Sequence, residues 1–130
     1  ASDVYKRQVQ RGDTVLCDRF THSTYAYQGG GRGVLIRELE FLAQFAHSNL
    51  WPDLTIYLDA PVDQAFARIR DREQDRIEQS GREFFERVRH KYLEMAKKDS
   101  RISVVDANQE LSTVQDDLRS LLGSFLSEQE

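Results

Sequence analysis

The chain has 130 residues, of which 39% are hydrophobic and 31% are charged, and its formal net charge is −4. This composition is typical of a folded domain, or of part of one, and excludes a disordered chain. The acidic balance argues against nucleic acid as a partner, and no apolar run reaches the roughly 18 residues that predict a membrane span. A single cysteine, Cys17, excludes an intrachain disulfide. Because no signal peptide is recognised either, we expect a cytoplasmic protein without a membrane partner.

Residues 1–8 are polar and aperiodic, and the chain does not start with Met. This segment is open to three interpretations: the end of a helix, a cloning remnant or an assembly artefact. We therefore leave residues 1–8 unassigned and base the fold on residues 9–130.

Apolar runs and helical periodicities alternate along the rest of the chain. Short apolar runs predict buried strands over residues 14–17, 54–58 and 102–105. Apolar positions at helical spacing predict helices over 34–48, from Pro61 onward, over 82–98 and from Leu111 to Phe125. Continuous apolar strands alternating with helices predict an α/β fold, a parallel sheet with flanking helices.

Each predicted strand ends on an acidic residue: Asp18, Asp59 or Asp106. Ligands of open parallel sheets bind beyond the carboxyl ends of the strands, so these acids are candidate site residues. Arg19 follows Asp18 directly, and the two could equally form a structural salt bridge.

Residues 21–33 form a polar, glycine-rich loop. On a short helical turn, Ser23, Thr24, Tyr27 and Gln28 would share one face, because residues three and four apart are neighbours. Two hydroxyls, a phenol and an amide can hydrogen-bond and stack on a heterocycle. The glycines at 29–31 and 33 would let a ligand approach the backbone closely, or they could simply form a hinge.

Residues 68–89 contain seven arginines and six acids. Such a run is usually a solvated helix with ion pairs between successive turns. The functional alternative is a mobile lid whose arginines, Arg68, Arg70, Arg72 and Arg76, reach a phosphate chain. The sequence contains no Gly-x-x-x-x-Gly-Lys-Ser/Thr motif, and its three histidines lack metal-ligand spacing.

Taken together, these motifs resemble the bacterial thymidylate kinase family. Residues 15–33 (VLCDRFTHSTYAYQGGGRG) strongly resemble its nucleoside-monophosphate site. Residues 51–60 look like its next core strand, residues 75–79 with 84–87 and 92–93 resemble its lid and following helix, and residues 105–107 resemble its last strand. The resemblance runs from about residue 9 to residue 126.

The resemblance implies transfer of a phosphoryl group from ATP to dTMP, with Mg²⁺, in dTTP biosynthesis. By position, Arg19 would bind the dTMP phosphate, Thr24 the thymine edge with Ser23 and Gln28 nearby, and Tyr27 would pack on the deoxyribose. Asp18 would lie near the phosphates and the metal ion, without ligating the metal directly, or it would orient Arg19. Arg72, or alternatively Arg70, would act on the transferred phosphoryl group, with Arg68 and Arg76 as further lid residues.

The family fold is a P-loop α/β domain with five parallel strands, and only three of these, without the P-loop strand, have counterparts here. We therefore expect the C-terminal part of such a domain, inactive alone, with an unpaired strand edge and an uncovered apolar face. Members of this family are typically homodimers, so the resemblance also implies a homodimer whose interface includes residues 34–48. Two alternatives stay open: a related nucleoside or nucleoside-monophosphate kinase, and a non-catalytic binding module.

Overall fold

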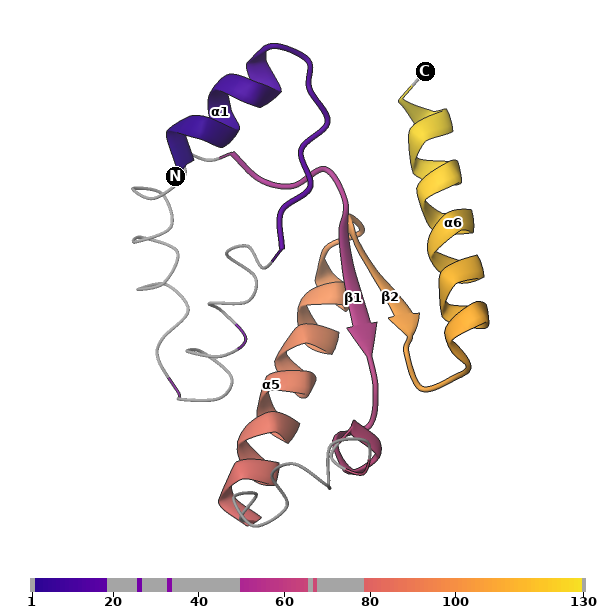
Figure 1. The fold of residues 1–130 in the computed structure, drawn as a ribbon. Coiled ribbons are helices and arrows are strands. Elements are labelled where there is room, and N and C mark those ends of the chain that lie inside the picture. The colour runs from indigo at the N-terminus through magenta and orange to yellow at the C-terminus, as the bar shows by residue number, and fades with distance from the viewer. Residues whose placement is uncertain are drawn as a thin grey trace.

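The computed structural model describes residues 2–18, 26, 33, 50–65, 67 and 79–129. They form helix α1 (Ser2–Gln10), strand β1 (Thr55–Asp59), helix α5 (Gln79–Lys98), strand β2 (Ile102–Asp106) and helix α6 (Leu111–Glu128) (Figure 1). Residues 62–65 and 67 add a short helical stretch after β1. None of the helices in this part of the chain is both long and apolar enough to cross a membrane.

Strands β1 and β2 lie side by side and run parallel, paired in register along their whole length. Both were predicted from their apolar runs, and their parallel pairing confirms the α/β class. Because successive side chains of a strand point to opposite faces, Tyr57 and Asp59 share one face of the pair with Asp106. Leu58 and Val105 share the other face.

Helices α5 and α6 flank the strand pair on opposite sides (Figure 1). Tyr92 of α5 stacks on Tyr57 of β1, with ring centroids 4.4 Å apart and ring planes 12° apart. Such an aromatic pair contributes about 0.5–1.5 kcal/mol beyond the area that it buries. On the other side, Val105 of β2 and Val114 of α6 are both buried. The predicted helices 82–98 and 111–125 are therefore confirmed, with α5 starting three residues earlier, at Gln79.

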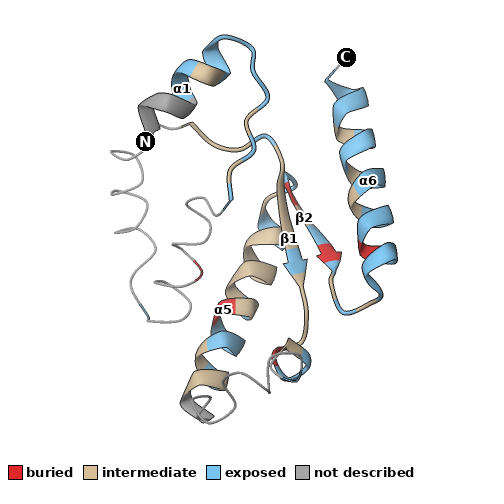
Figure 2. Cartoon of the chain, viewed as in Figure 1, coloured by how far each residue is buried: buried red, intermediate tan, exposed pale blue. Residues whose placement is uncertain are grey.

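The core formed by the described residues is small. Its buried apolar side chains lie mainly on α5, β2 and α6 (Figure 2) and are Ala26, Val62, Val88, Ile102, Val105 and Val114. Large apolar side chains remain on the surface, among them Leu58 at 51% exposure and Leu111 at 72%. This part of the chain therefore presents apolar surface that its own described elements do not cover.

The prediction that residues 14–17 form a buried strand is wrong. They adopt no regular secondary structure, Leu16 is 98% exposed, and Cys17 is half-buried. A strand is stabilised by hydrogen bonds to a neighbouring strand. The sheet of the described residues consists of β1 and β2, and residues 14–17 are not part of it.

Helix α1 occupies residues that the sequence left unassigned, and a helix was one of the three interpretations open there. It ends in a Schellman motif, in which the Asp13 amide donates to the Gln8 carbonyl and the Gly12 amide to the Val9 carbonyl, both at 3.0 Å. Gly12 has φ +88°, a left-handed conformation that glycine adopts without steric cost.

The turn between α5 and β2 is held by one carboxylate. Asp99 Oδ1 accepts from the backbone amide of Arg101 at 2.9 Å, and the Arg101 guanidinium donates to both Asp99 oxygens. The hydrogen bonds that the Arg101 guanidinium donates to Asp99 raise its pKa. This turn brings the chain from the end of α5 directly into the parallel strand.

Candidate functional site

The carboxyl edge of the strand pair brings two acidic residues together. Asp59 is the last residue of β1 and Asp106 is the last residue of β2, and the two are paired in register. The prediction that these two acids share an edge is confirmed. Asp18, the third acidic residue that was predicted at a strand end, is exposed and lies in a bend instead.

Asp59 forms a two-pronged ion pair with Arg89 of α5. Arg89 Nε donates to Asp59 Oδ1 at 2.8 Å, and Arg89 Nη2 donates to Asp59 Oδ2 at 3.1 Å. The Asp59 side chain is 16% exposed and that of Arg89 is 29% exposed. A bidentate, charge-assisted pair of this kind fixes both distance and orientation, so it anchors α5 to the end of β1.

The hydrogen bond from Arg89 to Asp59 raises the pKa of the Arg89 guanidinium, against a smaller opposing effect of burial. An arginine is already charged at every working pH, so this shift does not change its protonation state. It shows that the local field of Asp59 favours a cation at this place on the edge.

Asp106 stabilises the turn that leads from β2 into α6. Its Oδ1 accepts from the Asn108 amide at 2.8 Å, and its backbone carbonyl accepts from Gln109 Nε2 at 2.8 Å. The same Gln109 nitrogen also donates to Asp117 of α6 at 2.8 Å. Asp106 thus shapes the turn from β2 into α6, as short polar side chains often do in turns.

A second ion pair joins the same two parts of the chain. Arg82, in the first turn of α5, donates to Asp63 at 2.8 Å. The Asp63 side chain is 75% exposed and that of Arg82 is 42% exposed. Solvent screens such a pair, so it contributes at most about 1 kcal/mol.

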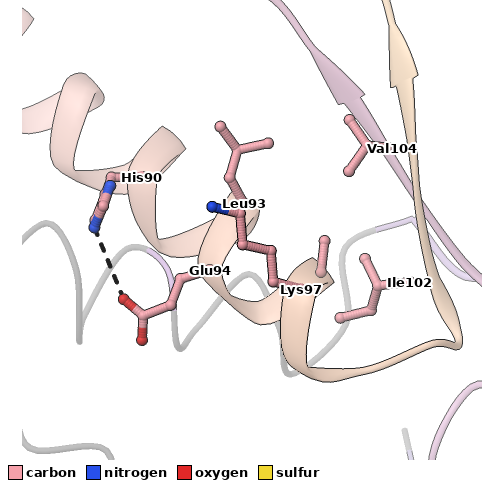
Figure 3. A pocket seen from close by; sticks show the side chains of 7 residues that line it. His90, Leu93, Glu94, Lys97, Ile102 and Val104 are labelled. Carbon is pink, nitrogen blue, oxygen red and sulfur yellow. Dashed lines mark ion pairs between the residues drawn. The ribbon is translucent and has the colours of Figure 1, made fainter.

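An apolar groove of about 420 Å³ lies between α5 and β2. Leu93, Ile102 and Val104 face the groove, while His90 and Glu94 lie at its rim (Figure 3). His90 Nε2 and Glu94 Oε2 are 3.8 Å apart. Hydrogen bonds from two lysines of α5, Lys91 first and then Lys98, lower the pKa of the Glu94 carboxyl.

Ile102 is the first residue of β2, so the groove lies toward the opposite end of the strand from Asp106. It is therefore separate from the carboxyl edge.

Most of the predicted site residues lie outside the described part of the chain. They are Arg19, Ser23, Thr24, Tyr27, Gln28, Arg68, Arg70, Arg72 and Arg76. Two isolated residues of the predicted binding loop are described. Ala26 is fully buried, and Gly33 has φ +78°. The conformation of Gly33 is one that a residue with a side chain would adopt only under strain, which accounts for a glycine at that place.

The sequence did not reveal Arg89 as the partner of the strand-end Asp59, or Arg82 as the partner of Asp63, because both arginines lie within a long run of mixed charge. A signal was nevertheless present for Arg89. It lies four residues after Phe85 and three before Tyr92, so it shares a helix face with aromatic residues. A charged residue on such a face has to meet an opposite charge when the face packs.

The described residues hold no cluster of three or more metal-ligating side chains. Mg²⁺ usually takes only one or two carboxylates and completes its shell with water and phosphate oxygens. Asp18 is an exposed carboxylate that could serve in that way, whereas both oxygens of Asp59 already accept from Arg89. By themselves, these residues do not make a magnesium site.

A parallel strand pair between helices, with acidic residues along its carboxyl edge, defines an α/β protein of the kind that binds ligands at that edge. Comparison with known proteins specifies the class further. The family model described as thymidylate kinase matches residues 1–118. The chain belongs to the thymidylate kinase family.

Three relatives show the extent of the similarity. The thymidylate kinase of Pseudomonas putida strain F1 is 46% identical over 127 residues, which cover 96% of this chain and 60% of the relative. That of Ectopseudomonas mendocina strain ymp is 48% identical over 125 residues, covering 95% and 60%. That of P. putida strain GB-1 is 47% identical over 123 residues, covering 93% and 59%. The chain thus spans about 60% of the length of the curated relatives that it matches.

Proposed function

We propose that this chain is part of an enzyme that transfers the terminal phosphoryl group of ATP to dTMP, giving dTDP, with Mg²⁺ as the metal ion. The observation that carries the proposal is the family match over residues 1–118, together with relatives named thymidylate kinase at 46–48% identity. The product is a precursor of dTTP, so the enzyme would act in nucleotide biosynthesis. We place it in the cytoplasm, as the single cysteine suggests.

Within that enzyme, the chain would contribute the acceptor site. Arg19 would bind the dTMP phosphate through a charge-assisted contact, which typically contributes about 1.5–3 kcal/mol. Thr24, with Ser23 and Gln28 nearby, would hydrogen-bond the thymine edge, and Tyr27 would pack against the deoxyribose.

The chain would also contribute the arginines that act on the transferred phosphoryl group. Phosphoryl transfer asks the protein mainly for positioning and charge stabilisation, and an arginine supplies both. Arg72, with Arg70 as the competing assignment, would take this role, and Arg68 and Arg76 would assist. Asp18 would lie close to the phosphates and orient Arg19. When bound, Mg²⁺ would neutralise phosphate charge.

The 130 residues alone are expected to show no dTMP kinase turnover and poor ATP binding. The reason is that the sequence contains no Gly-x-x-x-x-Gly-Lys-Ser/Thr loop, the segment whose backbone amides hold ATP phosphates in P-loop enzymes. We further propose that the complete enzyme is a homodimer, with residues 34–48 at the interface.

A fusion protein tests the proposed function. The N-terminal two-fifths of the P. putida F1 enzyme, which this chain does not match, would be joined to residues 1–130. A coupled assay for nucleoside diphosphate should detect dTDP formation, and Arg19→Ala should lower kcat/KM for dTMP by orders of magnitude. A folded fusion without turnover would refute the function. Near-normal kinetics of Arg19→Ala would refute the phosphate contact.

A related kinase acting on another nucleotide is the competing function. It is favoured by the same acidic strand end and the same arginine-rich segment, which do not themselves define the base. A panel of dTMP, dUMP, dCMP and thymidine with the fusion separates the two. Preference for dTMP supports the first proposal, and preference for any other member of the panel supports the second.

A further inference from the structure

The apolar groove between α5 and β2 is open to solvent on one side. Its floor consists of Leu93, Ile102 and Val104 (Figure 3). Ile102 is only 7% exposed, whereas Val104 is 44% exposed, so the α5 side of β2 is covered at its start and open at its middle. An open apolar groove of this kind is a candidate surface for a protein partner.

Basic side chains predominate on α5, the helix that forms one wall of the groove. This helix has six lysines and arginines but only three glutamates. Lys91 and Lys98 both donate to Glu94, at 3.1 and 3.3 Å. Lys97, in the last turn, is exposed and lines the groove, and it forms no ion pair with a described residue. The groove therefore combines an apolar floor with a cation that is not already paired there.

The C-terminal end of α6 has the complementary character. Leu122 and Leu126 lie one turn apart on this helix and are 43% and 52% exposed. The last turn has no basic residue, and Glu128, the last residue of the helix, is exposed. The carbonyl groups at a helix C-terminus add further partial negative charge. This end of α6 therefore presents exposed leucines together with negative charge.

The groove and the C-terminal end of α6 lie at the same end of the strand pair. Ile102 begins β2, and α6 starts beyond the other end of that strand and runs back alongside it (Figure 1). The 18 residues of α6 span about 27 Å, whereas the five residues of β2 span about 17 Å. Because α5 and α6 flank opposite faces of the strands, the two surfaces cannot meet within one copy of the chain.

We propose that two copies of this chain associate through these two surfaces. Leu122 and Leu126 of one copy lie in the α5–β2 groove of the other, where Lys97 faces the negative end of the incoming helix. Because both surfaces lie at the same end of the molecule, a twofold axis allows the two contacts to form together in a closed dimer. Each contact is small, so the dimer is weak, as is usual for interfaces below about 1,200 Å².

This association is separate from the interface proposed at residues 34–48, and it does not depend on the proposed function. Sedimentation velocity of the 130-residue chain over a concentration series measures it directly. The chain should form a dimer, and Leu126→Glu or Lys97→Glu should each raise its dissociation constant by about ten-fold or more. High salt should also weaken the dimer, because the charges involved are exposed.

Two variants serve as matched controls. Leu111→Glu changes a leucine of α6 that is 72% exposed but lies at the opposite end of the helix. Lys98→Glu makes the same change of charge as Lys97→Glu, in a lysine that donates to Glu94. Each control should leave the dissociation constant within about two-fold, because neither side chain lies in the proposed contact. Circular dichroism of all variants checks that the fold is kept.

A charge exchange identifies the two sides of the contact. Lys97→Glu and Glu128→Lys should each be monomeric alone, because like charges then meet at both contacts. Mixed in equal amounts, the two variants should form a heterodimer, because both contacts then join opposite charges. The inference is overturned by a parent chain that stays monomeric at every concentration, by a dimer that Leu126→Glu and Lys97→Glu leave intact, or by a mixture that stays monomeric.

Discussion

Asp59 and Arg89 should stabilise the fold together by more than an ordinary surface ion pair does. We expect a double-mutant cycle with Asp59→Asn and Arg89→Met to give a coupling free energy of about 1–2 kcal/mol. Exposed pairs give about 0.2–1 kcal/mol, and hydrogen bonds to charged groups in sheltered sites give about 1.5–3 kcal/mol. At 16% and 29% exposure, this pair falls between these limits.

The single variants should be unequal in their effects. Asp59→Asn leaves the Arg89 guanidinium half-buried without its carboxylate, so it should cost about 1.5–3 kcal/mol. Arg89→Met keeps much of the packing of the side-chain stem against the sheet and should cost less. For a chain of this size, each kcal/mol corresponds to roughly 3–5 °C in the unfolding midpoint.

The cycle is measured by urea unfolding of all four proteins, at low salt and in 0.5 M NaCl. The coupling should persist in high salt, because screening acts mainly on exposed charges. A coupling below about 0.3 kcal/mol, or one that disappears with salt, would refute the conclusion that the pair is sheltered and fixed.

Three further predictions concern single side chains. Val105→Ala should cost about 1–2.5 kcal/mol because the side chain is only 5% exposed, whereas Leu16→Ala, at 98% exposure, should change the unfolding free energy by less than about 0.5 kcal/mol; equal effects would contradict the assigned core. Gly12→Ala should cost about 1 kcal/mol because φ is +88°, and a neutral result would contradict the Schellman cap. Lysines lower the pKa of Glu94, so its contribution to stability is present above the glutamate pKa of unfolded chains, about 4.3, and is lost as the pH falls through the lower folded value. The difference in urea midpoint between Glu94→Gln and the parent should therefore fade below that pH, and a constant difference would contradict this.

The elements that the sequence predicted correctly are those with a local signal. Strands β1 and β2 are short apolar runs, and α5 and α6 carry apolar stripes at helical spacing. Acidic residues at the ends of both runs were enough to predict that Asp59 and Asp106 meet at one edge, because parallel strands present their carboxyl ends together.

The elements that were missed depend on contacts distant in sequence or on weak local patterns. Residues 14–17 have the composition of a strand, yet composition cannot supply the neighbouring strand that their hydrogen bonds require. Helix α1 is only nine residues long and polar on average, so the sequence left it unassigned, although Gly12 marks its end. Arg89 could not be assigned to Asp59 because the two residues are 30 positions apart and the charged run offers many other partners.

The acceptor-site residues were not assigned from local patterns of this kind. Their assignment depends on the resemblance of the sequence and on the family match. Arg19, Thr24, Tyr27 and Gln28 fall outside the described residues, so their roles remain predictions. Only Asp18, exposed in a bend, and the two isolated residues of the loop can be placed. Kinetics of substituted proteins are therefore the direct way to test them.

The most direct test of the central claim is the substrate preference of the fusion protein, measured as kcat/KM for dTMP, dUMP, dCMP and thymidine under identical conditions. If these residues form a dTMP acceptor site, dTMP should be the best substrate, and Thr24→Ala should reduce the preference for dTMP over dUMP. A folded fusion that turns over none of them, or that prefers a substrate other than dTMP, would contradict the account.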